Sequence, residues 1–368
     1  MKIVIAGNYG ANNLGDEMIL EGLLKLLKSI VPDAKITVLS AEPKDTKKRH
    51  NVKSLNLFPA GFRSFFRNLF DFKRENTKAV KDCDVFILGG GGLFGSLTFV
   101  ANLIWGLQAK MAYKYSKPVI MYGQSIGELK GKIRKRIVRK IYKKASLIVV
   151  RDNKSQKRLK DLKIKNKIYV APDLALNIED HHHPHQKNEV IIALRHLEDL
   201  SLIFKKGIAD FLYDIYDKND YKIQFIDFKS EVDNKLHEHV IDMLYQQCTV
   251  EHITLVKDTH ELFRLFSNAG FVLAMRLHAV IAAIMAEKPF IAINYAPKVK
   301  AFLEYAKLDE FLIDMDDLSE DTLMAMHKKI MKNKVSIRKR IQAFKAKSLV
   351  EHKKMGQILK TTLEKLAS

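Results

Sequence analysis

The chain has 368 residues, 47% hydrophobic and 29% charged, and its formal net charge is +21. This length predicts two domains rather than one core, and no apolar run approaches the roughly 18 residues of a membrane-spanning helix. The positive charge favours an anionic partner: nucleic acid, an acidic membrane surface or a phosphorylated substrate. Nucleic acid is not expected, because the sequence shows no RNP-type, zinc-finger or helix-turn-helix signature.

The sequence also suggests a compartment. The N-terminal residues, MKIVIAGNYG, pass directly from a short strand into a loop and lack the long apolar stretch of a signal peptide. Two cysteines, Cys83 and Cys248, form neither a disulfide framework nor a metal cluster. Both observations predict a cytoplasmic protein.

A strand predicted at residues 2–6 is followed by a loop that contains Gly10 and by a helix that begins near Leu14. The loop glycines do not have the G-x-G-x-x-G spacing of a dinucleotide-binding turn. Asp16 lies in the first turn of the helix, where negative charge is favourable. It either only stabilises the start of the helix or faces a ligand at the strand end, where a carboxylate can bind or deprotonate a sugar hydroxyl.

Four consecutive glycines, including Gly90 and Gly91, follow a strand predicted at residues 85–88. Such a run costs chain entropy, so it indicates a backbone that closely approaches a ligand or another backbone. A strand predicted at residues 118–122 ends in a similar segment, GQSIGELKG, and Arg151 follows a strand at residues 147–150.

Two stretches combine apolar and basic residues. Residues 58–74 interleave phenylalanines with arginines and lysines, and residues 130–144 form a basic helix with an apolar stripe of Ile133, Ile137, Val138 and Ile141. Each can lie at an anionic membrane surface or pack its apolar side on its own domain.

Residues 178–188, IEDHHHPHQKN, have no apolar periodicity and are predicted to be an interdomain linker. Their four histidines are too crowded for a designed metal site, so no functional metal is expected. Beyond them, strands are predicted at residues 189–194, 222–225 and 253–256.

The stretch 268–303 contains a buried strand at 271–275, a short helix at 279–287 and a second buried strand at 290–294. Arg276 and His278 follow the first strand, Lys298 follows the second, and Arg195 follows the strand at 189–194. Ligands bind outside the carboxyl ends of parallel strands, and the free N–H groups of a helix start favour an anion. Together these residues predict a site for a small anion with phosphate or carboxylate groups.

Strands alternate with helices in both halves, which predicts two doubly wound, Rossmann-like α/β domains facing across a cleft. The first covers residues 1–177 and the second residues 189–334, and the C-terminal helices at 335–368 can pack back on the first domain. One wall of the cleft is expected to hold the glycine loops and Asp16, and the other the cations of the second half.

Several segments resemble the polysaccharide pyruvyl transferase family, whose members are similar in organisation to GT-B glycosyltransferases. The resemblance covers nearly the whole chain. It rests on NYGANNLGDEMIL, LGGGGLFG, YGQSIGELKG, VVRDNKS, APDLAL and, most specifically, AMRLHAVIAAIMAEKPFIAINYAPKVKAFL.

This resemblance implies transfer of a pyruvyl group from phosphoenolpyruvate to two hydroxyls of a sugar, as a cyclic ketal. Phosphoenolpyruvate is then a co-substrate, and neither a cofactor nor a metal is expected. The acceptor is a surface or cell-wall polysaccharide precursor, often built on a lipid carrier, which makes a peripheral place at the inner membrane face an expectation. His278 is the expected general acid and Asp16 the base. The substrate-binding residues implied are Arg276, Lys298, Arg195, Arg151, Leu277, Gly90, Gly91 and Gly10.

Two alternatives remain open from the sequence. A nucleotide-sugar glycosyltransferase of GT-B architecture would use the same cleft. A non-catalytic basic protein would bind a membrane or nucleic acid through its lysine-rich surface and would not depend on His278.

Overall fold

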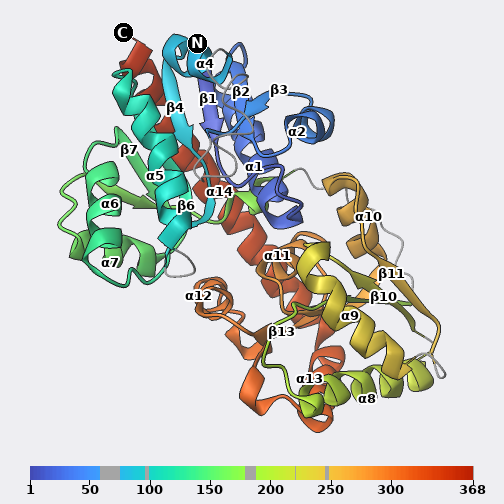
Figure 1. The fold of residues 1–368 in the computed structure, drawn as a ribbon. Helices are drawn as coiled ribbons and strands as arrows, with labels where there is room; N and C mark the ends of the chain where they lie inside the picture. The colour runs from blue at the N-terminus through green and yellow to red at the C-terminus, as the bar shows by residue number, and fades with distance from the viewer. Residues whose placement is uncertain (59–74, 96–98, 179–187, 220, 245–247, 368) are drawn as a thin grey trace. The chain divides into compact units, whose positions relative to one another are not determined.

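The structure, a computed structural model, describes residues 1–58, 75–95, 99–178, 188–219, 221–244 and 248–367 (Figure 1). The chain divides into two compact units. Unit 1 comprises Met1–Ile178 and Ser348–Ser368, and unit 2 comprises Glu179–Lys347. Residues 59–74 of the predicted phenylalanine-rich helix lie outside the described residues. So do residues 179–187, which carry the four histidines of the predicted linker.

Unit 1 is built on a parallel sheet in which the strand order runs β3-β2-β1-β4-β6-β7-β8, with β5 paired to β6. The chain moves outward from β1 to β3 and then crosses back to β4, so the order reverses between β1 and β4. Ligands bind at such reversal points in open α/β sheets. The strands are β1 (Lys2–Ala6), β2 (Lys35–Ser40), β3 (Lys53–Asn56), β4 (Val85–Leu88), β5 (Gly91–Phe94), β6 (Val119–Ile126), β7 (Leu147–Val150) and β8 (Ile168–Val170).

Both faces of this sheet are covered by apolar clusters. Successive side chains of a strand point to opposite faces, so β1 contributes to both clusters. Val4 and Ala6 of β1 belong to one apolar cluster, which also holds Trp105. Ile3 and Ile5 belong to a second cluster with the leucines of α1. The helices of unit 1 are α1 (Leu14–Ile30), α2 (Pro43–His50), α4 (Glu75–Asp82), α5 (Phe99–Lys114), α6 (Lys132–Tyr142) and α7 (Asn153–Asp161), with a 3-10 turn η1 (Leu174–Asn177).

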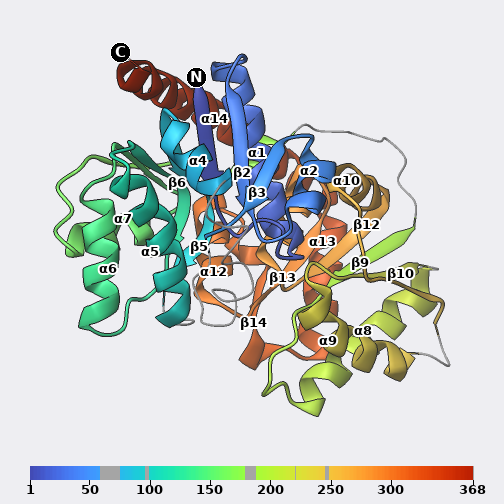
Figure 2. The ribbon, with the colours of Figure 1, turned by 45° about the horizontal axis from the view of Figure 1, so that its top comes forward.

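Helices α5 and α6 lie side by side in unit 1 (Figure 2). The close approach is possible because Gly106 of α5 has no side chain: an added Cβ would lie 3.1 Å from Ile137 and 3.2 Å from Ile141. The apolar stripe of α6 therefore packs mainly inward, with Val138 and Ile141 buried, whereas Ile133 at its start is 65% exposed. The stripe as a whole does not form a free membrane-binding face.

Unit 2 repeats the same winding with a parallel sheet of order β11-β10-β9-β12-β13-β14, and its reversal point lies between β9 and β12. The strands are β9 (Glu189–Ala193), β10 (Lys222–Ile226), β11 (Val250–Ile253), β12 (Ala269–Ala274), β13 (Phe290–Asn294) and β14 (Leu312–Asp314). The helices are α8 (Leu202–Asn219), α9 (Ser230–Leu244), α10 (Thr259–Asn268), α11 (Leu277–Met285), α12 (Pro297–Ala306) and α13 (Glu320–Lys332), with 3-10 turns η2 (Asp309–Phe311) and η3 (Met315–Asp317). The predicted pair of doubly wound α/β units is thereby confirmed.

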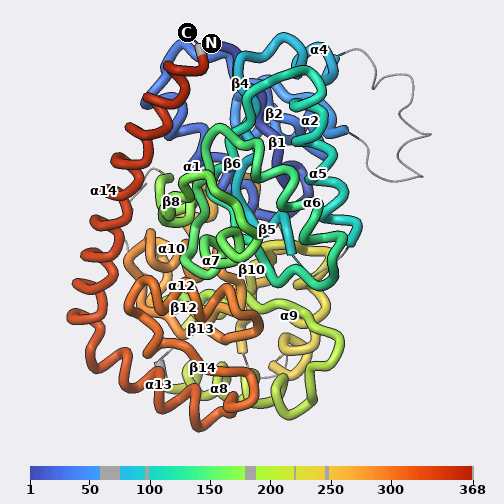
Figure 3. The backbone as a smooth tube through the Cα atoms, turned by 90° about the vertical axis from the view of Figure 1, so that its left-hand side faces the viewer, coloured from blue at the N-terminus to red at the C-terminus, as the bar shows by residue number. Residues whose placement is uncertain are grey.

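The last helix, α14 (Lys334–Ala367), is one continuous element and is drawn in red in Figure 3. Its residues from Ser348 onward belong to unit 1. There Met355, Leu359 and Leu363 complete the cluster that contains the leucines of α1, and an added Cβ at Gly356 would lie 3.0 Å from Leu26. The final turns of the chain are therefore core elements of unit 1.

Several predicted element boundaries differ from the structure, and three of the differences are informative. The strand predicted at 118–122 continues to Ile126, because Gly123 adopts a φ of +73° that lets the backbone bend within the strand. Part of the predicted glycine loop is strand β5, paired to β6. The strand predicted at 253–256 ends at Ile253. Its half-buried residues include Glu251 and His252, which a search for apolar runs misses.

Candidate functional site

Four side chains of unit 2 gather at the carboxyl ends of β9, β12 and β13, which are neighbours in the sheet. Arg195 follows β9, Arg276 follows β12, and Tyr295 and Lys298 follow β13. Because the strands are parallel, their ends meet at one edge, at the reversal point where a ligand is expected. The structure thus brings together the cations that the sequence predicted at separate strand ends.

Tyr295 lies at the centre of these cations, and we call Tyr295, Arg195 and Lys298 the Tyr295 cluster. The Arg195 guanidinium and the Lys298 ammonium each lie 5.3 Å from the centre of its ring. The Tyr295 hydroxyl and the Arg195 Nε are buried without a hydrogen-bond partner among the described residues. Buried polar groups normally have partners, so these two are ready to bind a polar ligand.

The cations change the acidity of the phenol. Burial raises the pKa of Tyr295, but the positive charges of Lys298, Arg195 and Arg276 lower it more strongly, so the pKa lies below the usual 10. A nearby positive charge favours the ionised form of an acid. The phenol is therefore a proton donor of increased acidity at this strand edge.

Two helix starts lie at the same edge. The N-caps of α11 and α12 are Arg276 and Ala296, and neither side chain hydrogen-bonds to the first turn of its helix. The N–H groups of a first turn have no intrahelical partners and carry partial positive charge. Together with Arg195 and Lys298 they suit a doubly charged anion.

His278 and Leu277 are the first residues of α11, so the helix begins two residues earlier than predicted. His278 is partly buried and Leu277 is 3% exposed. Leu277 therefore belongs to the core of unit 2, and a contact to substrate would have to come from its backbone. His278 has the position of a group that can meet a ligand at the start of the helix.

Arg276, which the sequence predicts to bind the anion, has its side chain committed to a carboxylate of the same unit. Its side chain is 9% exposed and forms a buried ion pair with Asp233 of α9, in which both Nε and Nη2 donate to the carboxylate. Asp233 Oδ2 also accepts the N–H groups of Phe228 and Lys229, at 3.0 and 2.9 Å. Arg276 thus ties β12 to the start of α9 and adds positive charge beside Tyr295.

In unit 1, Asp16 and Gly91 come together at the reversal point between β1 and β4. Asp16 is 7% exposed, and its Oδ2 accepts the side-chain amides of Asn8, at 2.7 Å, and Asn13. Asn13 is the N-cap of α1 and makes no capping bond, and its side-chain amide donates to Asp16. The two amides fix the orientation of the Asp16 carboxylate. A residue that only stabilised the start of α1 by its charge would not need to be oriented in this way.

The glycines of unit 1 are explained by close packing. An added Cβ at Gly90 would lie 2.9 Å from the Gly123 carbonyl oxygen, and one at Gly91, where φ is +100°, would lie 3.0 Å from Asp16 Oδ1. Gly10, with φ +67°, donates its N–H to Glu17 at 2.8 Å in the turn before α1. Of the two interpretations of the glycine run, close approach to another backbone is correct for Gly90.

Arg151 is committed to an internal network. Its Nη1 donates to Asp173 and its Nε to Ser125, both at 2.6 Å, and its side chain is 8% exposed. Asp173 also caps η1 by accepting the Ala175 N–H at 3.0 Å. The Arg151–Asp173 pair joins the ends of β7 and β8. The segments VVRDNKS and APDLAL, which carry these two residues, therefore have a structural role.

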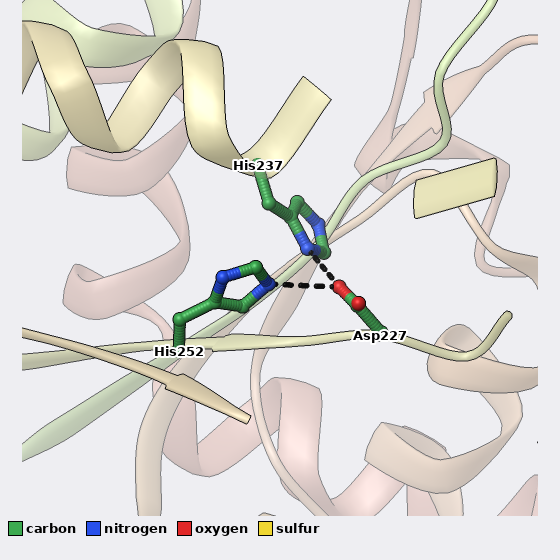
Figure 4. A group of neighbouring side chains, drawn as sticks. All are labelled: Asp227, His237 and His252. Carbon is green, nitrogen blue, oxygen red and sulfur yellow. Dashed lines mark hydrogen bonds and ion pairs between the residues drawn. The ribbon is translucent and has the colours of Figure 1, made fainter. Parts of the chain in front are cut away.

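Asp227, His237 and His252 form a further cluster at the end of β10 (Figure 4). His237 Nδ1 and His252 Nε2 lie 2.6 and 3.0 Å from Asp227 Oδ1. Burial raises the pKa of Asp227, but these two hydrogen bonds lower it more, to about 2. The carboxylate is therefore ionised at neutral pH.

This cluster has the residue types of a metal site, but its hydrogen bonds argue against one. The Leu194 N–H donates to His237 Nε2 at 2.9 Å, so the proton of neutral His237 is on Nδ1 and faces Asp227. A metal would need the lone pair of that nitrogen. Asp227 and His252 alone offer two ligands, fewer than a zinc site uses. The cluster instead holds Leu194, the residue before Arg195.

Sequence reasoning missed Tyr295 and Asp233 as site residues. Tyr295 stands three residues before Lys298 at the same strand end, so its position was a usable signal. Asp233 had none, because it lies 43 residues from Arg276 in the sequence and meets it only through the sheet.

The chain was also compared with known proteins. A sequence model of the family described as "Polysaccharide pyruvyl transferase" matches residues 13–297, which include Asp16, Arg195, Arg276 and His278. The chain belongs to this family. The predicted resemblance is thereby confirmed, and membership assigns the chain to transferases that act on polysaccharide. Lys298 and Gly10 lie just outside the matched residues.

One curated protein that is similar to this chain is the amylovoran biosynthesis protein AmsJ of Erwinia amylovora. It is 22% identical over 424 residues, with 98% of this chain and 100% of the relative covered. Its name refers to the biosynthesis of a polymer and not to a donor. It therefore supports polysaccharide modification and leaves the chemistry open.

Two solved structures that are similar to this family member contain UDP with glucose, or a UDP-sugar. Anabaena Alr3699/HepE in complex with UDP and glucose has a TM-score of 0.63 at 13% identity, with 99% of this chain and 100% of that chain covered. The UDP-GlcNAc 2-epimerase of Neisseria meningitidis bound to UDP-GlcNAc has a TM-score of 0.67 at 12% identity, with the same coverage. At such identities the likeness shows the GT-B-type fold alone. Within the described part of the chain, no helix is both long and apolar enough to cross a membrane.

Proposed function

We propose that this family member transfers the pyruvyl group of phosphoenolpyruvate to two hydroxyls of a sugar in a polysaccharide or its precursor and forms a cyclic ketal. The observation that carries the proposal is the Tyr295 cluster at the carboxyl ends of β9, β12 and β13. Phosphoenolpyruvate carries a phosphate ester and a carboxylate on the same carbon, C2. Arg195, Lys298 and the first turns of α11 and α12, to which neither N-cap side chain hydrogen-bonds, supply charge and N–H donors for both.

The proposed reaction balances without a further reactant. Protonation of the methylene carbon makes C2 electron-poor, and the first sugar hydroxyl attacks C2. The C2–O bond to phosphate breaks, and the second hydroxyl attacks C2 to close the ketal. One hydroxyl proton replaces the proton taken by the methylene carbon, and the other leaves with inorganic phosphate. The reaction as written uses phosphoenolpyruvate as a co-substrate and requires no metal.

We assign roles in proton transfer and anion binding to three groups. His278 is the proposed general acid, because an imidazole exchanges protons near neutral pH. Asp16, which two amides hold in unit 1, is the proposed base or hydrogen-bond acceptor for a sugar hydroxyl. Tyr295 is proposed to donate a hydrogen bond to the phosphate or carboxylate, since its buried hydroxyl has no partner among the described residues.

The test of this function is calorimetric titration with phosphoenolpyruvate. Lys298→Ala is expected to weaken binding roughly 10-fold to 100-fold, as for the loss of one charge-assisted contact of about 1.5–3 kcal/mol. Lys300→Ala removes another exposed lysine from the same helix and is the matched control. Equal weakening by both variants would show only a general effect of charge.

The rival function is a nucleotide-sugar glycosyltransferase, and a panel of UDP-sugars in the same titrations separates the two. Saturable binding of a UDP-sugar, with none of phosphoenolpyruvate, would reject pyruvyl transfer. Product analysis gives the second criterion: the proposed enzyme releases inorganic phosphate and adds a ketal, whereas a glycosyltransferase adds a sugar.

Tyr295→Phe provides a separate prediction, because it keeps the ring between the two cations and removes only the hydroxyl. In a spectroscopic pH titration, the wild-type protein is expected to show tyrosinate absorbance from Tyr295 below pH 10, and Tyr295→Phe is expected to lose this step. Phosphoenolpyruvate adds negative charge beside the hydroxyl, so it should move the step to higher pH. A step that phosphoenolpyruvate does not move would place the anion elsewhere.

A further inference from the structure

A surface of unit 1 combines exposed apolar side chains with unpaired cations. Phe99, Val100 and Leu103 in the first turns of α5 are 39%, 53% and 42% exposed, and Ile133 at the start of α6 is 65% exposed. The Arg134 guanidinium lies 5.9 Å from the centre of the Phe99 ring and joins the two helix starts. We call Phe99, Val100, Leu103 and Ile133 the apolar edge.

The charge of α6 continues this surface. Between residues 132 and 144 the chain carries eight lysines and arginines and no acidic residue, and seven of the eight are exposed. Among the described residues, none of the eight forms an ion pair with a carboxylate. Helix α6 packs inward through Val138 and Ile141, so its cations are held on the outside of a folded unit. The helix does not have to fold on binding.

We propose that the apolar edge and the cations of α6 dock this protein on an anionic lipid bilayer. A bilayer surface is the partner that fits both features, because aliphatic and aromatic side chains enter the headgroup boundary while lysine and arginine meet anionic headgroups. A nucleic acid would use the cations but would leave Leu103 and Ile133 exposed to water. The inference does not depend on pyruvyl transfer, so either can fail alone.

Sedimentation of the full chain with lipid vesicles tests the proposal. Vesicles of phosphatidylcholine with phosphatidylglycerol are expected to bind the protein, and vesicles of phosphatidylcholine alone to bind it weakly. Arg136→Glu with Lys140→Glu should weaken binding to the anionic vesicles at least 10-fold, since each cation near the surface contributes about fivefold. The matched control, Lys353→Glu with Lys354→Glu, makes the same change of net charge at exposed positions of α14. Because it leaves the α6 surface intact, binding should stay within about threefold of the wild type.

A second pair of variants tests the apolar edge. Leu103→Ser with Ile133→Ser is expected to weaken binding at least 10-fold. Leu202→Ser with Ile203→Ser, at positions 67% and 78% exposed on unit 2, is the control and should leave it unchanged. Equal effects of a test pair and its control would overturn the proposal. A DNA duplex that displaces the protein from the vesicles would also overturn it. Because all four positions of these pairs are exposed, circular dichroism should show a native fold for each variant.

Discussion

Replacing Arg276 with methionine is expected to lower the free energy of unfolding by about 3–5 kcal/mol, the cost of removing one partner of a buried ion pair. The reason is Asp233, whose side chain is fully buried and would lose the guanidinium that neutralises it. Urea unfolding followed by circular dichroism measures the change. Methionine keeps much of the volume, so the loss reports on charge rather than on a cavity.

Two further variants sharpen this prediction. Arg340→Met breaks an ion pair with Glu310 in which both side chains are about 40% exposed, and should cost no more than about 1 kcal/mol. The double variant Arg276→Met with Asp233→Asn should be more stable than Arg276→Met, because it no longer buries an unpaired carboxylate. A loss at Arg276 no larger than that at Arg340 would contradict the buried pair. Lys298, which forms no such pair with any residue that the structure describes, is the cleaner position for measuring anion binding.

Acidification is expected to destabilise the protein between pH 6.5 and 4. Burial lowers the pKa of His327 and of His352 to about 4. Both rings are thus neutral in the fold, whereas the unfolded chain takes up protons below its ordinary pKa of about 6.5. Their contribution is fully present above pH 6.5, declines as the pH falls to 4, and is lost below it. The expected loss is about 3 kcal/mol per histidine.

The two histidines have different surroundings, so their variants are informative separately. His327 packs edge-on against Phe211 and Phe271 in unit 2. His352 Nε2 donates to the Asp173 carbonyl oxygen at 3.1 Å in unit 1. Urea midpoints measured from pH 7.5 to 4 should fall less steeply in His327→Gln and in His352→Gln than in the wild type. His260→Gln, at an exposed position of α10, is the control, and an unchanged slope in both test variants would refute this account.

Much of the fold could be predicted because buried parallel strands leave a clear pattern. The apolar run of β12 and the cations after it fixed both the strand and the edge where the site lies. The positions of Arg195 and Lys298 at this edge could be predicted in this way, since a strand end can be read without knowing which strands are neighbours.

What could not be predicted depends on contacts between distant segments. Arg276 looks like a free cation until Asp233 of α9 is placed beside it. Asp227 and His237 look like solvated residues until the sheet brings them beneath Leu194. Similarly, the glycine run signals a close approach, but only the fold identifies Gly123 as the neighbour of Gly90. The identity of a partner is a property of topology rather than of local sequence.

The course of α14 has a consequence for synthesis on the ribosome. Unit 2 is continuous in sequence, from Glu179 to Lys347, so it can complete its core as soon as that segment emerges. Unit 1 begins first but must wait for Met355, Leu359 and Leu363, which fill its core from the far end of the chain. Domains usually fold in the order in which they are made. Here we expect unit 2 to complete its core before unit 1, which lacks these three side chains until Leu363 has been synthesised.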